Sequence, residues 1–108
     1  MYQKMSVWWK NENLIFDGIT LDICPGGLFI VTGHLLPLKS IIDILFCLAK
    51  GAPCFCQGEV IWVNRGQITH YPPGFGVQFL KIEPDILEQL IVLCSDWEGE
   101  ERAGLYNW

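Results

Sequence analysis

The chain has 108 residues, of which 51% are apolar and 18% are charged, and its formal net charge is −5. A chain of this length folds around one core, and a charged fraction below the roughly 25% of an average domain excludes a disordered tail or linker. The seven basic residues are spread along the sequence without forming a basic stripe, which argues against binding of DNA or RNA through phosphate neutralisation.

The sequence also lacks the features of membrane insertion and export. Its longest lipid-like stretch, residues 44–49, is far shorter than the roughly 20 apolar residues of a spanning helix. The first residues show neither the charged region nor the apolar run of a signal peptide. We therefore expect a cytoplasmic protein without membrane insertion.

The chain has five cysteines, an odd number that argues against a disulfide framework. We expect reduced and buried thiols at Cys24, Cys47, Cys54, Cys56 and Cys94. Cys54 and Cys56 form a Cys-x-Cys pair, but no second pair follows at zinc-finger spacing, and neither His34 nor His70 stands in a ligand pattern. The sequence therefore predicts core cysteines on one face of a strand and no metal site.

Alternation of apolar and polar residues dominates most of the chain and predicts six strands. In chain order they cover residues 7–10, 14–23, 27–32, 40–48, 54–63 and 75–80. Turn signals separate them, above all Pro25-Gly26 and the run of two prolines and a glycine at 72–74.

The fourth and fifth predicted strands carry apolar residues on nearly both faces, which is typical of well-covered central strands. In the fifth strand the alternation predicts that Val60 and Trp62 share one face and that Ile61 and Val63 share the other.

The pattern changes at Glu83-Pro84-Asp85. A proline suits the first helical position, and the acids beside it suit the positive end of the helix dipole. Apolar residues, Ile91 among them, then recur at helical spacing over 84–97 and predict one C-terminal helix.

These elements predict a mainly β fold. It is a six-stranded antiparallel β-barrel over about residues 7–82, closed to remove its edges, which the helix plugs or flanks. Residues 98–108 form a short tail, and the whole chain, 1–108, is expected to be a single domain.

Motifs for catalysis are absent from the sequence. It contains no nucleophile elbow, phosphate loop, zinc-protease motif or dinucleotide fingerprint. A dyad of Cys24 with His34 or His70 has little support, because structural and surface histidines are far more common. We therefore expect no enzyme activity.

One segment, from Thr20 to Ile30, carries chemically suggestive residues. Asp22 and Cys24 stand two apart at a strand end, directly before Gly26 and Gly27, which let a ligand or another backbone come close. This arrangement is a candidate binding corner. On physical grounds alone it fits better a β-turn in which Asp22 caps backbone amides and the glycines supply positive φ.

Three motifs, in the same order and spacing, resemble those of the PilZ domain family. Asp22-x-Cys24-x-x-Gly27 resembles Asp/Asn-x-Ser-x-x-Gly. Residues 58–63, GEVIWV, resemble the strand motif Gly-x-Val-x-Trp, and residues 73–79, PGFGVQF, resemble Pro-Gly-hydrophobic-Gly-Val-x-Phe.

This resemblance implies a six-stranded barrel and a receptor for cyclic di-GMP, without any other cofactor. It places half of the ligand site at Asp22, Cys24, Gly26 and Gly27. In the family, the other half is an Arg-x-x-x-Arg before the first strand. Arginine suits this task because its planar fork binds phosphates and reads guanine edges.

The chain departs from that pattern in both halves. Residues 1–6 read MYQKMS, in which Lys4 replaces one charge but not the fork. Cys24 replaces the family's serine, and a thiol is a weaker hydrogen-bonding group than a hydroxyl. Losing two bidentate contacts of about 1.5–3 kcal/mol each weakens binding by roughly two to four powers of ten. An Arg-x-x-x-Arg preceding Met1 in a longer chain would reverse this expectation and favour cyclic di-GMP binding.

Family members without the arginine pair act through protein contacts, among them proteins of type IV pilus assembly. The resemblance therefore implies a bacterial signalling or assembly adaptor. Its expected partner is a signalling, motility or pilus-assembly protein, and a homodimer is the alternative.

Candidate contact residues are aromatics outside the best-patterned elements, which suit a docking patch or a cap on a barrel end: Trp8, Trp9, Tyr71, Tyr106 and Trp108. Within Trp8-Trp9 the strand period directs one ring into the core and the other outward.

Overall fold

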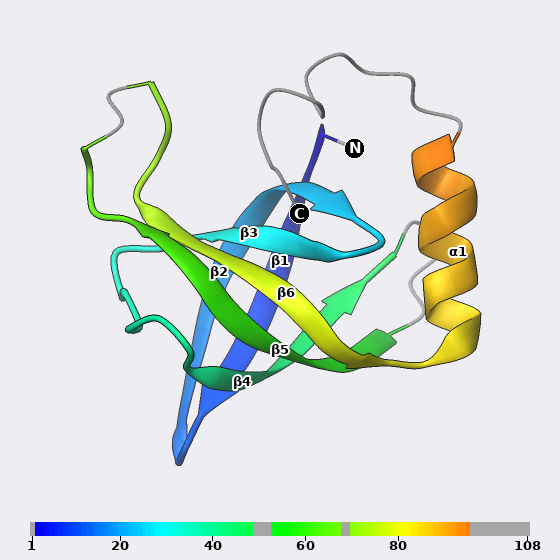
Figure 1. Cartoon of the computed structure of the whole chain (residues 1–108), viewed down its shortest axis with the longest axis horizontal. Helices are drawn as coiled ribbons and strands as arrows, with labels where there is room; N and C mark the ends of the chain where they lie inside the picture. The colour runs from blue at the N-terminus through cyan, green and yellow to red at the C-terminus, as the bar shows by residue number, and fades with distance from the viewer. Residues whose placement is uncertain (1, 49–52, 68–69, 96–108) are drawn as a thin grey trace.

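The computed structural model describes residues 2–48, 53–67 and 70–95, without the side chains of 2–4, 21 and 95. The described part of the chain forms six strands and one helix (Figure 1). Their bounds are β1 (Tyr2–Asn11), β2 (Leu14–Cys24), β3 (Gly27–Val31), β4 (Ile41–Cys47), β5 (Pro53–Asn64), β6 (Gly74–Ile82) and α1 (Pro84–Ser95).

The strands form a closed barrel in the order β1-β2-β3-β6-β5-β4. Every neighbouring pair is antiparallel. Closure pairs both edges of every strand, so the sheet offers no free edge for aggregation. The predicted fold class, a mainly β six-stranded antiparallel barrel with one helix, is confirmed.

Strand β1 starts earlier than the alternation predicted, at Tyr2 instead of residue 7. Tyr2 is the cross-strand partner of Asp22 and Met5 is the partner of Thr20, with an irregularity between these two pairs. Backbone pairing with the long strand β2 extends β1 where the side chains show no clear alternation. Residues 2–6, which the prediction left outside the first strand, are therefore part of the barrel.

The barrel interior is filled by one side-chain layer from every strand, with Trp9 at its centre. The Trp9 ring stacks on Phe16 at 5.5 Å between centroids and meets Phe75 edge-on at 5.7 Å. Trp9 is 1% exposed, whereas Trp8 is 42% exposed. The expected inward and outward pair is confirmed, but Trp9 belongs to the core, and its assignment to a contact surface was wrong.

Strand β4 and the first half of β5 are covered on one face only, not on both. Ile41 in β4 is 45% exposed and Phe55 in β5 is 66% exposed, while their neighbours Ile42 and Cys54 are buried. A barrel strand has a single inner face, and α1 makes its main contacts with β2. The prediction of well-covered central strands was wrong for this reason.

A bulge in β5 changes the faces that the alternation predicted. Val60 pairs with Val77 and Val63 pairs with Phe75, so both valines face the interior. The register shifts between Val60 and Trp62, because one extra residue is accommodated there. Trp62 therefore lies on the outer face, and its predicted sharing of a face with Val60 was wrong.

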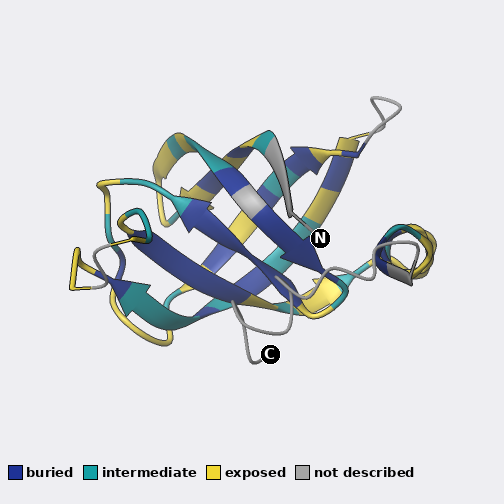
Figure 2. Cartoon of the chain, turned by 90° about the horizontal axis from the view of Figure 1, so that it is seen from above, coloured by how far each residue is buried: buried dark blue, intermediate teal, exposed yellow. Residues whose placement is uncertain are grey.

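Helix α1 flanks the barrel and does not plug it (Figure 2). Pro84 is its first residue, and the Leu87 amide donates to the Glu83 carbonyl at 2.9 Å. Ile86, Leu90 and Cys94, spaced four apart, are the buried stripe, whereas Ile91 is 51% exposed and lies outside it. Residues 96–97 of the predicted helix lie outside the described residues.

We predict that the two adjacent tryptophans differ sharply in their effect on stability. Trp9→Ala leaves a large void between Phe16 and Phe75, so the free energy of unfolding should fall by about 3–5 kcal/mol. Trp8→Ala, the matched control, should change it by less than about 1 kcal/mol. Urea unfolding followed by far-UV circular dichroism measures both. Equal losses would contradict the inward and outward assignment.

Candidate functional site

A bulge near the end of β2 places Asp22 and Cys24 on the outer face of the barrel. Thr20 pairs with the core residue Ile30, the register then shifts, and Asp22 pairs with Phe29. The Thr20 hydroxyl donates to the Asp22 carbonyl oxygen at 2.9 Å and so closes the bulge. Asp22 and Cys24 lie on the same face, as the sequence predicted.

The glycines of this corner serve packing between strands. Of the described glycines, Gly66 has a positive φ, at 102°, whereas Gly26 and Gly27 do not. A Cβ at Gly27 would overlap the carbonyl oxygen of Val77 in β6, so glycine there permits close approach of another backbone. The Gly26 carbonyl accepts a hydrogen bond from the Phe79 amide at 2.8 Å. The expectation of positive φ at this turn was wrong.

Both polar side chains of the corner are buried. Asp22 is 1% exposed and Cys24 is 7% exposed. Burial raises the pKa of the Cys24 thiol, the amides of Gly26 and Gly27 act in the opposite direction, and Asp22 adds to the rise. Cys24 therefore remains a neutral thiol near pH 7, which is a poor nucleophile and a weak hydrogen-bonding group.

Aromatic rings cover the outer face next to Asp22. Along one row of cross-strand partners, Asp22 is followed by Phe29, Gly76 and Trp62. The Phe29 ring lies 5.0 Å from Trp62 and 4.9 Å from Tyr71, between centroids. Phe29 is fully buried. We call Phe29, Trp62 and Tyr71 the aromatic cover.

The absence of a side chain at Gly76 leaves space for the Trp62 ring of the aromatic cover, because a Cβ there would overlap the Trp62 indole nitrogen. Asn64, which is 1% exposed, fixes the loop that carries Tyr71. Its Nδ2 donates to the carbonyls of Tyr71 at 3.2 Å and Pro72 at 2.9 Å. Tyr71 is therefore part of a packed cluster with Phe29 and Trp62. Sequence reasoning missed Asn64 and Phe29 as its supports.

The remaining predicted site residues lie partly or wholly outside the described part of the chain. Lys4 lies in β1, which pairs with β2 beside the corner, and its side chain is among those not described. Tyr106 and Trp108 lie outside the described residues. Of the two arginines, Arg65 follows β5 and Arg102 lies outside the described residues.

Comparisons with known proteins identify the fold family. The PilZ domain family model matches residues 3–96. The chain belongs to the PilZ domain family. Among solved structures, the Bacillus subtilis inhibitor of motility (MotI/DgrA) is similar, with a TM-score of 0.79 at 11% sequence identity over 99% of this chain. The match covers 51% of that protein, so this chain spans about half its length. Among curated proteins, none matches the chain.

The cysteines of this PilZ domain do not all follow the prediction of burial. Cys24, Cys54 and Cys94 are buried, Cys56 is partly buried, and all five are free thiols. Cys47 is exposed, because it occupies an outward position at the end of β4, opposite Pro53. No group of three or more His, Cys, Asp or Glu side chains lies close enough for a metal ion within the described ranges. No helix in those ranges is long and apolar enough to cross a membrane.

We predict that the PilZ domain has one fast-reacting thiol in its native state. Cys47 is exposed, whereas burial raises the pKa of Cys56 to about 12 and also raises that of Cys24 and Cys54. A raised pKa keeps the reactive thiolate scarce until the pH approaches that value. Titration with Ellman's reagent at pH 8 should show a fast phase of one thiol per chain, which Cys47→Ser removes. A fast phase surviving in that variant would contradict the assignment.

Proposed function

We propose that this PilZ domain is a non-enzymatic bacterial adaptor that acts through protein contacts, and that it binds cyclic di-GMP weakly or not at all. The observation that carries the proposal is the burial of the family's ligand motif by the chain's own side chains. Asp22 and Cys24 are 1% and 7% exposed, and the row beyond Asp22 is occupied by the aromatic cover. A ligand would have to displace this packing before it could contact the motif.

The charges of the chain support the same proposal. Cyclic di-GMP carries two phosphates, and the chain has a net charge of −5 with two arginines, Arg65 and Arg102. The segment that would carry the arginine pair reads YQKMS at residues 2–6 and is built into β1. Long-range repulsion adds less than the missing contacts, because salt screens it within about 10 Å.

Support for a protein partner comes from the fold comparison and the surface. The similar Bacillus subtilis protein is an inhibitor of motility, and the outer wall of the barrel exposes large apolar side chains, among them Trp8 and Phe55. A signalling, motility or pilus-assembly protein of the cytoplasm is the partner class that this proposal implies. Of the aromatic set within the described residues, Trp8, which is 42% exposed, is the contact residue that this proposal retains.

A cyclic di-GMP receptor with a non-standard site is the second candidate. It is favoured by the retained Asp22 and Gly27 and by the position of Tyr2, which pairs directly with Asp22. In this alternative the aromatic cover opens and offers a ring for guanine stacking.

Isothermal titration of the full chain with cyclic di-GMP separates the two candidates. Starting from micromolar family binding, loss of the arginine pair predicts a dissociation constant of about 100 µM or weaker. A value in the low micromolar range would overturn the proposal in favour of the receptor.

The double variant Tyr2→Arg and Ser6→Arg tests whether the corner is still a competent half-site. These positions are four apart in β1, and Tyr2 stands opposite Asp22. Affinity should rise by at least about tenfold if Asp22 can still contact guanine. The matched control with lysine at both positions adds the same charge without the fork and should gain less. No gain in either variant would mean that the corner is purely structural.

A further inference from the structure

The outer face of β1, β4 and β5 carries a row of exposed apolar side chains. Trp8 is the cross-strand partner of Leu45, and Leu45 is the partner of Phe55. Trp8 is 42% exposed and Phe55 is 66% exposed. Because direct partners point to the same face of a sheet, the three side chains form one apolar band across the barrel wall. We call it the Trp8–Phe55 band.

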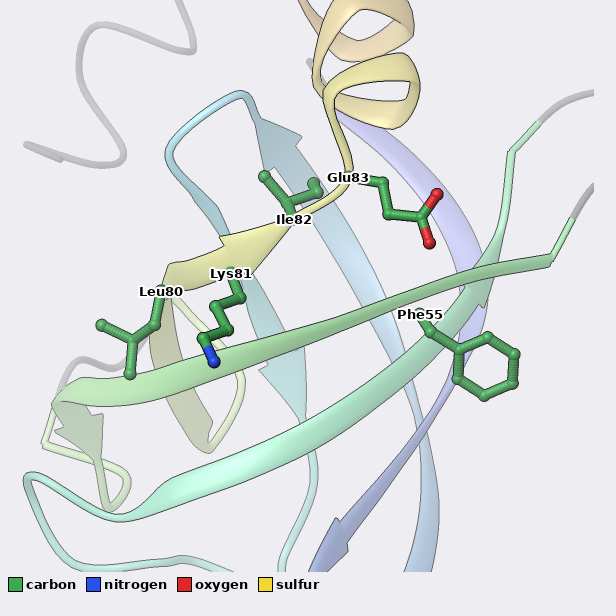
Figure 3. A pocket seen from close by; sticks show the side chains of 5 residues that line it. All are labelled: Phe55, Leu80, Lys81, Ile82 and Glu83. Carbon is green, nitrogen blue, oxygen red and sulfur yellow. The ribbon is translucent and has the colours of Figure 1, made fainter.

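Phe55 stands between two surface hollows. One, of about 210 Å³, is lined by Trp8, Ile15 and Leu45 together with the residues beside them. The other, of about 490 Å³, is lined by Leu80, Ile82 and Glu83 with Phe55 at its side. Figure 3 shows the Phe55 ring projecting away from β5. The smaller hollow is open to solvent, and Phe55 itself forms part of its wall, so the same face presents an exposed aromatic ring beside an apolar depression.

Charged residues of both signs flank the Trp8–Phe55 band. Lys10 in β1 is the cross-strand partner of Asp43 in β4, and both are exposed and line the smaller hollow. Lys81 and Glu83 line the larger one. Asp17, the exposed cross-strand partner of Trp8 in β2, adds a further acid. In a chain with a net charge of −5, this face therefore carries charge of both signs instead of a uniformly acidic surface.

We propose that the Trp8–Phe55 band is a homodimer interface, on which a second copy of this chain docks face to face about a two-fold axis. The axis runs along the boundary between β1 and β4, parallel to the strands. A two-fold interface must be self-complementary, because each contact from residue i to residue j occurs twice.

This symmetry pairs the charges of the two copies. Rotation about that axis exchanges β1 with β4, so Lys10 faces Asp43 of the second copy and Asp43 faces its Lys10. Trp8 faces Leu45 of the second copy in the same way. Phe55, one strand further out, lies over β2 of the second copy at Asp17, the exposed cross-strand partner of Trp8, with Ile15 two residues along that strand.

Charge complementarity favours a second copy of this chain as the molecule that binds to the Trp8–Phe55 band. A strongly basic partner would meet Lys10 and Lys81, and a strongly acidic one would meet Asp43 and Glu83, at a cost that rises with desolvation. A second copy satisfies both signs at once. The association does not depend on whether the Asp22 corner binds cyclic di-GMP, and the two proposals are tested by different readouts.

The first test is the oligomeric state of the full chain. Sedimentation equilibrium over a concentration series up to about 1 mM should show a monomer–dimer equilibrium. Phe55→Ser should raise its dissociation constant by about tenfold or more, because an aromatic anchor is lost. Leu38→Ser, at a residue that is 58% exposed outside the band, is the matched control and should leave it unchanged.

The second test uses complementary charge variants. Lys10→Asp places like charges opposite each other in its own dimer, and so does Asp43→Lys, so each variant alone should be monomeric. Mixed one to one, the two variants restore both ion pairs across the axis and should form a heterodimer. Thermal unfolding of each variant checks that the monomer is folded, since the change also places like charges side by side within the chain.

Three results would overturn the proposal. A wild-type chain that stays monomeric at the highest concentration excludes the dimer. A dimer that Phe55→Ser leaves intact lies on another face. Charge variants that dimerise alone, or that fail to associate when mixed while folded, exclude the two-fold arrangement.

Discussion

Closure of the sheet is the constraint on which the rest of this structure depends. A closed barrel gives every strand one inner face, and in this chain that face is filled around Trp9, Phe75 and Phe46. Apolar side chains that point outward must then be covered by the chain itself or remain in contact with water. The chain uses both solutions on different sides of the barrel.

Over β3, β6 and β5 the chain covers its own outer wall. Phe29 is fully buried beneath Trp62 and Tyr71, and Asn64 holds the Tyr71 loop in place through its side-chain amide. Over β1, β4 and β5 no comparable cover exists among the described residues, and Trp8 is left 42% exposed. The first side bears the family's ligand motif, and the second bears the Trp8–Phe55 band. The two sides are therefore suited to different roles.

Alternation along the sequence was sufficient to predict β2 to β6 to within two residues and the second half of β1, and the proline at position 84 was sufficient to predict where the helix begins. The alternation failed to predict which side chains of β5 share a face, because a bulge there inserts one residue. The shift beside Trp62 moves that ring to the outer wall, and no local composition marks the position, because the bulge depends on pairing with β6. The burial of Asp22 could not be predicted for a similar reason. The elements packed beside Asp22 come from elsewhere in the chain: Phe29 of β3 is its cross-strand partner, and α1 packs on β2, where the Cys94 thiol donates to the Ile23 carbonyl at 3.7 Å.

Two glycines of the motifs that identify the family have packing roles in this barrel. Gly27 admits the backbone of β6, and Gly76 admits the ring of Trp62. Either glycine can be required by the barrel alone, so a match to these motifs establishes the fold without establishing cyclic di-GMP binding. Asp22 differs, because a buried carboxylate is costly unless its surroundings compensate it. Whether Asp22 contributes to a ligand site or only to the hairpin is therefore the chemical question that the arginine variants decide.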